Sequence, residues 1–338
     1  MKKLLRSGHL PLFATVLVLV MLFGTASFLY EGFFSARVLV NLFGDNAFLG
    51  IAAVGMTFVI LSDGIDLSVG SVLAFTTTFV AFMVQKHHLH PGIAIVLALA
   101  IGSIFGGIMG LFIHRYELPP FLVTLGGMFF ARGMAFVVSK ESLGIDHPLY
   151  QRVADFIIPV QGGAGFSAIA LVFLFVFLLG VVLAHWTRFG RTIYAIGGSE
   201  SSARMMGLPV GASKIMVYAL NGFCSALAGV AATFYMGSGN PAFGSGFELD
   251  VIASVVIGGT LLTGGVGTIA GTLAGVLIFG TIQSALTFDG RLNSWWLRIA
   301  IGLLLLLFIL FQRFLTRTSA PTVQTDVPIT TQRKPQPV

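Results

Sequence analysis

The stretch MTFVILSDGIDLSVGSVLAF, residues 56–75, sets two carboxylates three residues apart inside an otherwise apolar run. Small residues follow each acid closely, and the pair Asp63-Gly64 is typical of a turn rather than of a continuing helix. A charge left unpaired at the centre of a membrane helix costs on the order of 3 kcal/mol. We therefore expect a break between two apolar segments here, with water or a partner side chain reaching both Asp63 and Asp66.

The composition around this stretch is that of a helical membrane protein. Only 9% of the 338 residues are charged and 56% are apolar, whereas about a quarter of a soluble domain is charged. A membrane-spanning helix needs about 20 apolar residues. Uncharged runs of that length occur at 10–30, 93–113, 156–184, 215–247 and 251–288. The expected fold class is therefore all-α and polytopic.

About ten transmembrane helices are expected, with short polar connections between most of them. They are placed at 10–30, 46–62, 66–85, 92–113, 119–139, 166–186, 214–236, 248–263, 266–287 and 295–313. Residues 46–85 and 248–287 leave a second possibility open. Each could form a discontinuous, Gly-rich re-entrant hairpin, which would leave eight full crossings without changing the orientation of the chain.

Basic residues gather on one side of this arrangement. They are Lys2, Lys3, Arg6, Arg115, Arg188, Arg191, Arg204, Lys214, Arg313 and Arg317. Because cytoplasmic loops carry an excess of Lys and Arg, both termini and the loop at 187–213 are expected in the cytoplasm. Residues 1–315 then form one transmembrane domain, and residues 316–338 form a disordered cytoplasmic tail. No basic stripe with interleaved aromatic residues indicates nucleic-acid binding.

A segment 201 residues further along the chain is similar in sequence to this stretch. IAAVGMTFVILSDGIDLSVGSVLA (51–74) aligns with IASVVIGGTLLTGGVGTIAGTLAG (252–275), and the second copy has glycines where the first has its two acids. Small residues therefore suffice for the break. Internal repeats and discontinuous helices are common in transporters, although these two copies run in the same direction, which fits an inverted repeat poorly. The candidate hinge glycines are Gly64, Gly70, Gly264, Gly265, Gly267 and Gly271.

The polar interruption at 187–213 predicts one short surface helix. Ser199 is a good N-cap, Glu200 lies in a first turn favoured by the helix dipole, and Gly207 followed by Pro209 ends the helix. Apolar residues rimmed by charge on such a helix indicate a docking surface, although the helix could instead fold against its own loop. The residues assigned to this helix are Ser199, Glu200, Ala203, Arg204, Met205, Met206, Gly207 and Leu208.

Five segments together resemble the membrane subunits of ribose-type ABC sugar importers. They are VILSDGIDLSVGS (59–71), PPFLVTLGGMFFARG (119–133), TRFGRTIYAIGGSESSARMMGLPV (187–210), GFELDVIASVVIGGTLLTGGVGTIAGTLAG (246–275) and FDGRLNSWWLRIAIG (288–302). Within that family, NAFLGIAAVGMTFVIL (46–61) and FDGRLNSWW (288–296) are most similar to permeases of galactofuranose importers.

The resemblance implies a permease subunit of the bacterial inner membrane. Its expected partners are a separate ATP-binding cassette ATPase, a second permease that is a copy or a paralogue, and a periplasmic sugar-binding protein. ATP and Mg would bind to the ATPase, because this chain has no GxxxxGK[ST] loop. In such importers a short cytoplasmic helix docks on the ATPase, and residues 199–208 occupy its place. The chain departs from the family pattern at Asp63, where glycine is usual, and at Ser199, where asparagine is usual.

Candidate residues of the substrate path are Asp63, Asp66, Ser68, Thr57, Arg132 and Asn221. Asp66 belongs to the family pattern and either caps the following helix or lines the path. Arg132 is a functional candidate by default, and it could also snorkel or pair with a carboxylate. Glu248 and Asp250 are expected to start a helix. No catalytic residue is assigned, and His87, His88 and His90 fit a solvated loop better than a metal site.

The function expected is therefore transport without covalent chemistry in this chain. Sugar would cross between two permease subunits while ATP is hydrolysed in partner subunits. The alternative is an ion-coupled secondary transporter of a small polar solute, in which Asp63, Asp66 or Arg132 would carry the coupling ion.

Overall fold

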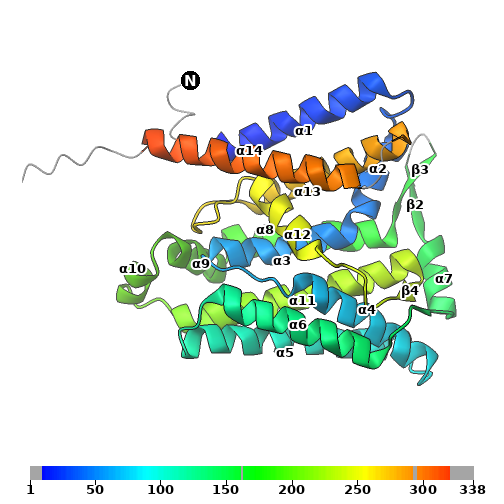
Figure 1. Cartoon of the computed structure of the whole chain (residues 1–338), viewed down its shortest axis with the longest axis horizontal. Helices are drawn as coiled ribbons and strands as arrows, with labels where there is room; N and C mark the ends of the chain where they lie inside the picture. The colour runs from blue at the N-terminus through cyan, green and yellow to red at the C-terminus, as the bar shows by residue number, and fades with distance from the viewer. Residues whose placement is uncertain (1–9, 161–162, 292–294, 320–338) are drawn as a thin grey trace, which may run out of the picture.

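The computed structural model describes residues 10–160, 163–291 and 295–319. In these residues the chain is mostly helical, with two small two-stranded sheets (Figure 1). The helices are α1 (Leu10–Leu29), α2 (Ala36–Asp45), α3 (Ala47–Leu61), α4 (Val69–Gln85), α5 (Pro91–Arg115), α6 (Pro120–Val138), α7 (Pro148–Asp155), α8 (Ala168–Trp186), α9 (Arg188–Gly198), α10 (Glu200–Met205), α11 (Val210–Met236), α12 (Phe247–Ile257), α13 (Ile269–Asp289) and α14 (Trp295–Ser319).

The strands are short and lie between helices. They are β1 (Leu143–Gly144), β2 (Ile157–Val160), β3 (Ala164–Ser167) and β4 (Ser238–Gly239). β1 pairs antiparallel with β4, and β2 pairs antiparallel with β3. The long helices run roughly along one direction in Figure 1, with α9 and α10 at its left and α7 with the β2–β3 hairpin at its right. We call these the α10 end and the α7 end.

The number of helices that could span a membrane alone is smaller than expected. Six described helices are long and apolar enough (α1, α5, α6, α8, α11 and α13), and α2 with α3 would make a seventh across a bend of 56°. The expectation of about ten spanning helices is therefore not confirmed. The physical reason is that the chain leaves the helix at 62–68 and again at 258–268, so α3, α4 and α12 have only 15, 17 and 11 residues.

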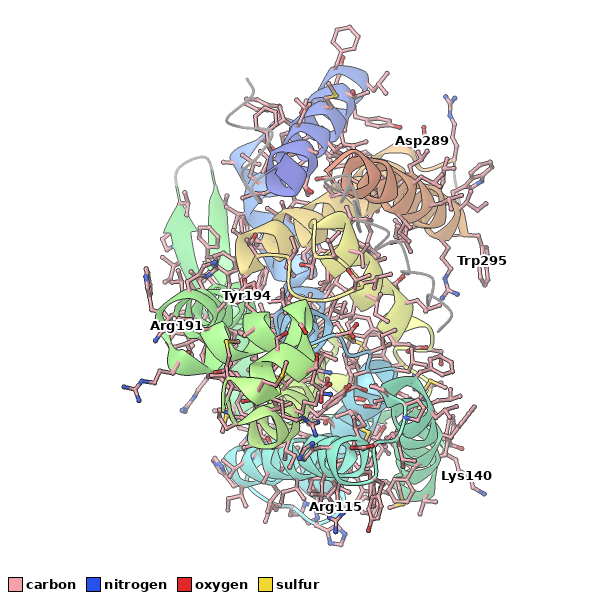
Figure 2. All side chains as sticks on the ribbon, turned by 90° about the vertical axis from the view of Figure 1, so that its left-hand side faces the viewer. Arg115, Lys140, Arg191, Tyr194, Asp289 and Trp295 are labelled. Atoms are coloured by element: carbon pink, nitrogen blue, oxygen red, sulfur yellow. The ribbon has the colours of Figure 1, made fainter. Side chains whose placement is uncertain are left out.

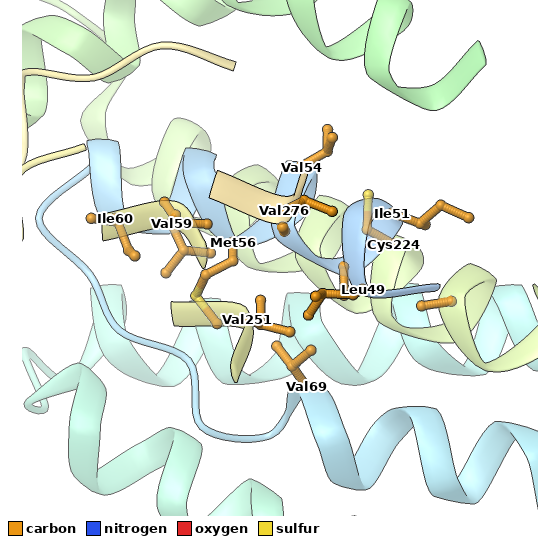
Figure 3. Close-up of a cluster of buried hydrophobic side chains, with 14 of the residues drawn as sticks. Leu49, Ile51, Val54, Met56, Val59, Ile60, Val69, Cys224, Val251 and Val276 are labelled. Carbon is orange, nitrogen blue, oxygen red and sulfur yellow. The ribbon is translucent and has the colours of Figure 1, made fainter. Parts of the chain in front are cut away.

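The helix before the first break, α3, is the centre of the core. All of its residues except Phe48 are buried, as expected for a helix that is apolar on every side. It packs against α8, α11, α12 and α13. Figure 3 shows its side chains among Cys224 of α11, Val251 of α12 and Val276 of α13.

A second seam, between α5 and α11, depends on small residues. Gly102, Gly106 and Gly110 lie one helical turn apart and face the α11 backbone around Tyr218 and Gly222 so closely that a Cβ would collide with it. Close approach through small residues four apart is a common way to pack membrane helices, because dispersion contacts replace the missing hydrophobic drive.

The break after α3 begins with a left-handed residue. Asp63 has φ 61°. Its N–H donates to Ile60 O at 3.0 Å, and Gly64 N–H donates to Val59 O at 3.0 Å. This is the Schellman pattern, which satisfies carbonyls at a helix end and favours glycine in the left-handed position. Asp63 thus adopts a conformation that suits glycine, the residue usual at this place in the family pattern. Asp tolerates this left-handed conformation better than most residues.

The break at 62–68 and the break at 258–268, which the internal repeat aligns with each other, are in contact. Gly265 N–H donates to Leu61 O at 3.0 Å, and Gly264 lies against the backbone of Asp63. Both breaks lie at the α10 end, beside Gly197 of α9. The first break is therefore not the tip of a hairpin that turns inside the bundle, because α3 reaches the end of the molecule before the chain turns.

Other elements differ from the sequence expectation. Residues 188–198 were expected to be loop but form α9, and α14 continues to Ser319, so residues 316–319 of the expected tail are helical. The rest of that tail and the basic residues Lys2, Lys3 and Arg6 lie outside the described residues.

The left-handed turn predicts how substitutions at Asp63 behave. Asp63→Asn should leave thermal stability unchanged, because Asn also tolerates positive φ. Asp63→Val should lower the free energy of unfolding by about 1–2 kcal/mol, because a β-branched side chain clashes with its own backbone there. Thermal unfolding of the purified variants in one detergent measures the difference. Equal melting temperatures for the two variants would contradict the turn.

Candidate functional site

The carboxylate of Asp66 is buried and fully engaged. Asp66 has an exposed fraction of only 1%. Oδ1 accepts hydrogen bonds from the backbone N–H of Ser68 at 2.8 Å and from Ser68 Oγ at 2.7 Å. Oδ2 accepts from Asn221 Nδ2 at 2.8 Å. Three donors offset much of the desolvation that an isolated buried charge would suffer.

Asp66 acts just before the helix start rather than within it. Ser68 is the N-cap residue of α4, and its own side chain makes no capping bond. Asp66 therefore binds the N-cap residue, in an Asx turn, and its charge lies close to the positive end of the α4 dipole. Asp66 is therefore not the cap of α4 itself, as one of the two expectations had it, but binds the residue that is. Asn221 lies near the middle of the 27-residue α11, so this junction sits deep in the bundle.

Arg132 is bonded to backbone carbonyls instead of a carboxylate. Nη1 donates to Pro241 O at 2.8 Å and to Phe243 O at 2.7 Å, and Nη2 donates to Gly244 O at 3.2 Å. In the described part of the chain no acid lies within ion-pair distance of it. A pairing with a carboxylate is therefore wrong, and Arg132 instead holds the irregular segment that leads into α12.

The two irregular segments converge where α4 and α12 begin. A Cβ on Gly70, in the first turn of α4, would lie 2.6 Å from both Gly244 O and Glu248 Oε2. From this junction α4 runs toward the α7 end, since Gly239 of β4 lies against Thr77, and α12 runs toward the α10 end, where its loop meets Gly197. Two helix N-termini thus face each other, with Asp66 before one and Glu248 and Asp250 in the first turn of the other.

The remaining candidates of the path are packed between helices. The hydroxyl of Thr57 is 2.7 Å from that of Thr272, which joins α3 to α13, and Thr57 and Asn221 are both 0% exposed. Gly64 lies against Tyr218, Gly267 against Thr260, and Gly271 against Gly258. Among the candidate hinge glycines, Gly264, Gly265 and Gly267 have positive φ angles of 73°, 71° and 155°. Residues with a side chain rarely adopt positive φ angles.

The short surface helix expected at 200–206 is confirmed as α10, Glu200–Met205. Ser199 Oγ accepts the N–H of Ser202 at 3.3 Å, so serine caps the helix as expected. Gly207 has φ 74° and ends it. Met205 and Met206 are 82% and 67% exposed. Leu208, expected to be exposed, instead packs with Ile196, Ala203 and Val210.

Glu200 ties this helix to α11. Its carboxylate binds Arg204 at 2.7 Å and Lys214 at 2.5 Å. Partial burial by itself would raise the pKa of Glu200, but the hydrogen bonds from Lys214 and Arg204 outweigh it and lower the pKa below the ordinary value. These three residues line a cavity of about 360 Å³ with Asp63 and His114, so the end of α3 and the surface helix share one polar hollow.

Sequence reasoning missed two residues of this arrangement. Lys214 lies 14 positions after Glu200, and no helical spacing links two residues on different helices. Glu248 was given a helix-start role only, yet its Oε2 is buried at the junction without a hydrogen-bond partner among the described residues. Its position ahead of an apolar run was the only signal.

Figure 2 views the molecule from the α10 end. Arg115 and Arg191 lie at the rim of this face, and α9 and α10 are in its foreground. The basic residues Arg115, Arg188, Arg191, Arg204 and Lys214 all belong to elements that meet at this end. Five described cations of the predicted cluster therefore meet at one end, whereas Lys86 and Lys140 lie away from it.

Comparisons with known proteins identify related chains. Residues 38–310 match the family model described as "Branched-chain amino acid transport system / permease component". The chain is 48% identical over 324 residues to the inner membrane ABC transporter permease protein YjfF of Escherichia coli, covering 94% of this chain and 98% of the relative. It is 37% identical to the fructose import permease protein FruG of Bifidobacterium longum, covering 90% and 91% of the two chains.

A third relative is the ribose import permease protein RbsC of Bacillus subtilis. It is 39% identical over 293 residues, which cover 85% of this chain and 88% of the relative. No solved structure gives a significant match.

The Asp66–Asn221 bond predicts a coupled loss of stability. Asn221→Ala leaves Asp66 Oδ2 buried without its donor, which should cost about 1–3 kcal/mol. In an Asp66→Ala background the same substitution should cost much less, because nothing is left unpaired. Thermal unfolding of the four proteins gives the coupling. Ser225→Ala, one turn along α11 and bonded only to its own helix, is the matched control; equal costs of Asn221→Ala in both backgrounds would show that the bond is unimportant.

The lowered pKa of Glu200 predicts a pH window for the ion pairs of α10. Their contribution is fully present above the ordinary Glu pKa of 4.5 and is lost as the pH falls through the lower folded value. Lys214→Gln should therefore speed amide hydrogen exchange at residues 200–208 relative to the parent protein at pH 7, with the ratio falling toward one as the pH drops below the ordinary Glu value and through the lower folded one. Lys140→Gln, at the other end of the molecule, should leave the ratio at one throughout. A ratio for Lys214→Gln that does not change with pH would refute the role of the ion pairs.

Proposed function

The chain belongs to the family of branched-chain amino acid transport system permease components, and we propose that it is the membrane-spanning permease of an ATP-driven sugar importer. One named relative is an ABC transporter permease, and the other two are import permeases for fructose and ribose. It is a permease subunit and not an enzyme. The observation that carries the sugar assignment is the 37–39% identity with fructose and ribose permeases along most of both chains.

In this proposal α10 is the contact with the ATPase. The helix is short, capped, held to α11 by Glu200, and presents Met205 and Met206 to solvent. Exposed methionines on a charged surface offer adaptable apolar contact to a cleft on a partner. ATP and Mg would bind in that partner. The basic residues at the α10 end favour a cytoplasmic position for this end.

The proposal retains ten crossings with both termini in the cytoplasm. The segments at 62–85 and 237–257 would each cross partly as irregular chain and partly as the helices α4 and α12. Irregular backbone at membrane depth requires partners inside the protein, and Asp66 and Arg132 supply them. Asp66, Ser68 and Asn221 would hold this junction beside the sugar path rather than grip the sugar.

The sugar we propose is galactofuranose, carried by a complex of this chain with a second, paralogous permease and a periplasmic binding protein. Support for the sugar comes from the segments 46–61 and 288–296, which are similar to galactofuranose permeases. At the two departures from the family pattern, Asp63 takes a left-handed conformation that also suits glycine, and Ser199 caps α10 with its side chain.

Uptake by the complete complex in proteoliposomes tests the proposal. ATP is supplied on the side of the membrane that carries the ATPase, and labelled galactofuranose should accumulate on that side. Galactopyranose, ribose and fructose should accumulate at least tenfold more slowly. Met205→Asp should reduce both uptake and recovery of the ATPase with this chain at least tenfold, because a charge replaces the exposed apolar contact.

Ser201→Asp is the matched control on the same helix, since an acid in the first turn of a helix is favourable. Ion-driven uptake by this chain alone, without ATP, would refute the importer. ATP-driven uptake of ribose or fructose in preference to galactofuranose would refute only the choice of sugar.

A further inference from the structure

Two neighbouring hollows open at the bend between α2 and α3. Their volumes are about 280 and 340 Å³, and Asp45, Asn46 and Gln283 line both of them. We call the two together the Asp45 groove. The sequence assigns Asp66, Ser68, Thr57, Arg132 and Asn221 to the substrate path. None of these residues lines either hollow.

The groove extends from the middle of the molecule toward the α7 end. Asn46 packs against Gly280, near the middle of α13, and Thr287 lines the groove close to the end of that helix. Phe247 and Asp250 at the start of α12 line its inner part. The groove therefore begins beside the junction of α4 and α12 and opens outward from it.

The groove cannot face lipid. Asp45 and Gln283 are exposed although they belong to apolar segments, and a charged or amide side chain in hydrocarbon is costly. Asp45 accepts one hydrogen bond, from Tyr235 Oη at 3.3 Å. By contrast, α8 exposes apolar residues such as Leu178, which is 60% exposed. The polar surface of the groove therefore fits water, a polar ligand or a polar protein partner rather than lipid, and its wetness is what the labelling below measures.

The lining combines hydrogen-bonding side chains, including Arg298, with an apolar wall, and this combination suits a polyhydroxyl ring. Phe48 lies 6.0 Å from Phe243 and 5.8 Å from Phe247, ring centre to ring centre, which gives an apolar wall for the C–H face of a sugar. The carboxylates of Asp45 and Asp250 and the amides of Asn46 and Gln283 accept hydrogen bonds from hydroxyl groups. Among the described residues no group of three His, Cys, Asp or Glu side chains comes together.

We propose that the Asp45 groove is a transit subsite for a monosaccharide, in which the ring packs on Phe48 and its hydroxyl groups donate to Asp45 and Gln283. The inference rests on the proposed sugar importer and adds the place of binding. The volume of each hollow is near the lower limit of ligand pockets, which suits one monosaccharide at a time. Asp66 and Asn221 then lie behind the wall of the path and do not contact the sugar.

Single-cysteine labelling tests the groove. Cys224 is the one cysteine of the chain and is buried, so within this chain only the added cysteine is open to the reagent, and the unsubstituted complex shows any effect of labelling its partners. In the complete complex, a water-soluble trimethylammonium methanethiosulfonate should modify Gln283→Cys, and the modification should reduce ATP-driven monosaccharide uptake at least tenfold. Thr287→Cys, which lines the same groove, provides a second position should the first variant fail to assemble. Leu178→Cys, also exposed but on the apolar surface of α8, should remain unmodified with normal uptake.

Two outcomes overturn the inference. One is that neither groove cysteine reacts, which would make the groove dry. The other is that they react while uptake continues at the unmodified rate, which would make the groove wet but outside the path. Both are distinct from failure of the proposed function, because that function is judged on ATP-driven sugar uptake by the unsubstituted complex, measured in the same vesicles.

Discussion

The structure depends on satisfying backbone that is not helical inside an apolar bundle. Buried N–H and C=O groups without partners each cost free energy comparable to a lost hydrogen bond. Asp66 binds the N–H of Ser68 before α4, and Arg132 binds three carbonyls before α12. An acid serves the segment that needs an acceptor and a base serves the segment that needs donors, so both charges are accounted for by the backbone they stabilise.

These two contacts allow α4 and α12 to start at one place and run in opposite directions. Glycines are required where they meet, because a side chain on Gly70 would collide with Gly244 O and Glu248. Facing helix N-termini repel through their positive ends, and acids nearby offset this repulsion. Asp66, Glu248 and Asp250 supply the negative charge. Asp66 and the distant pair Glu248 and Asp250 thus serve one junction.

One helix connects this junction to the surface. Lys214, in the second turn of α11, binds Glu200 of α10, and Asn221, two turns further along, binds Asp66. Between them α11 packs against α3 and α5, and Val217 and Tyr218 are buried there. A displacement of α10 would therefore act on the same rigid helix that holds the break, which gives the proposed ATPase contact a direct mechanical link to the middle of the bundle.

The sequence by itself determined the elements that depend on local chemistry. Uncharged apolar runs placed the long helices, Ser199 and Gly207 bounded the surface helix, and Asp63-Gly64 marked the break, because each signal lies within a few residues. The sequence did not determine how far the short helices reach, since α3, α4 and α12 end where glycines and turns interrupt them rather than where apolar residues end. It also assigned Arg132 possible carboxylate partners, since backbone acceptors leave no trace in a residue pattern.

Only the tertiary structure decided which polar residues are available to a ligand. Asp66, Thr57 and Asn221 are polar and central, yet packing between α3, α4, α11 and α13 closes them off. Asp45 and Gln283 are 238 positions apart and unremarkable in the sequence, and the bend between α2 and α3 places them in one groove. Exposure depends on which faces of distant helices meet, and that is a property of the assembled bundle rather than of any one segment.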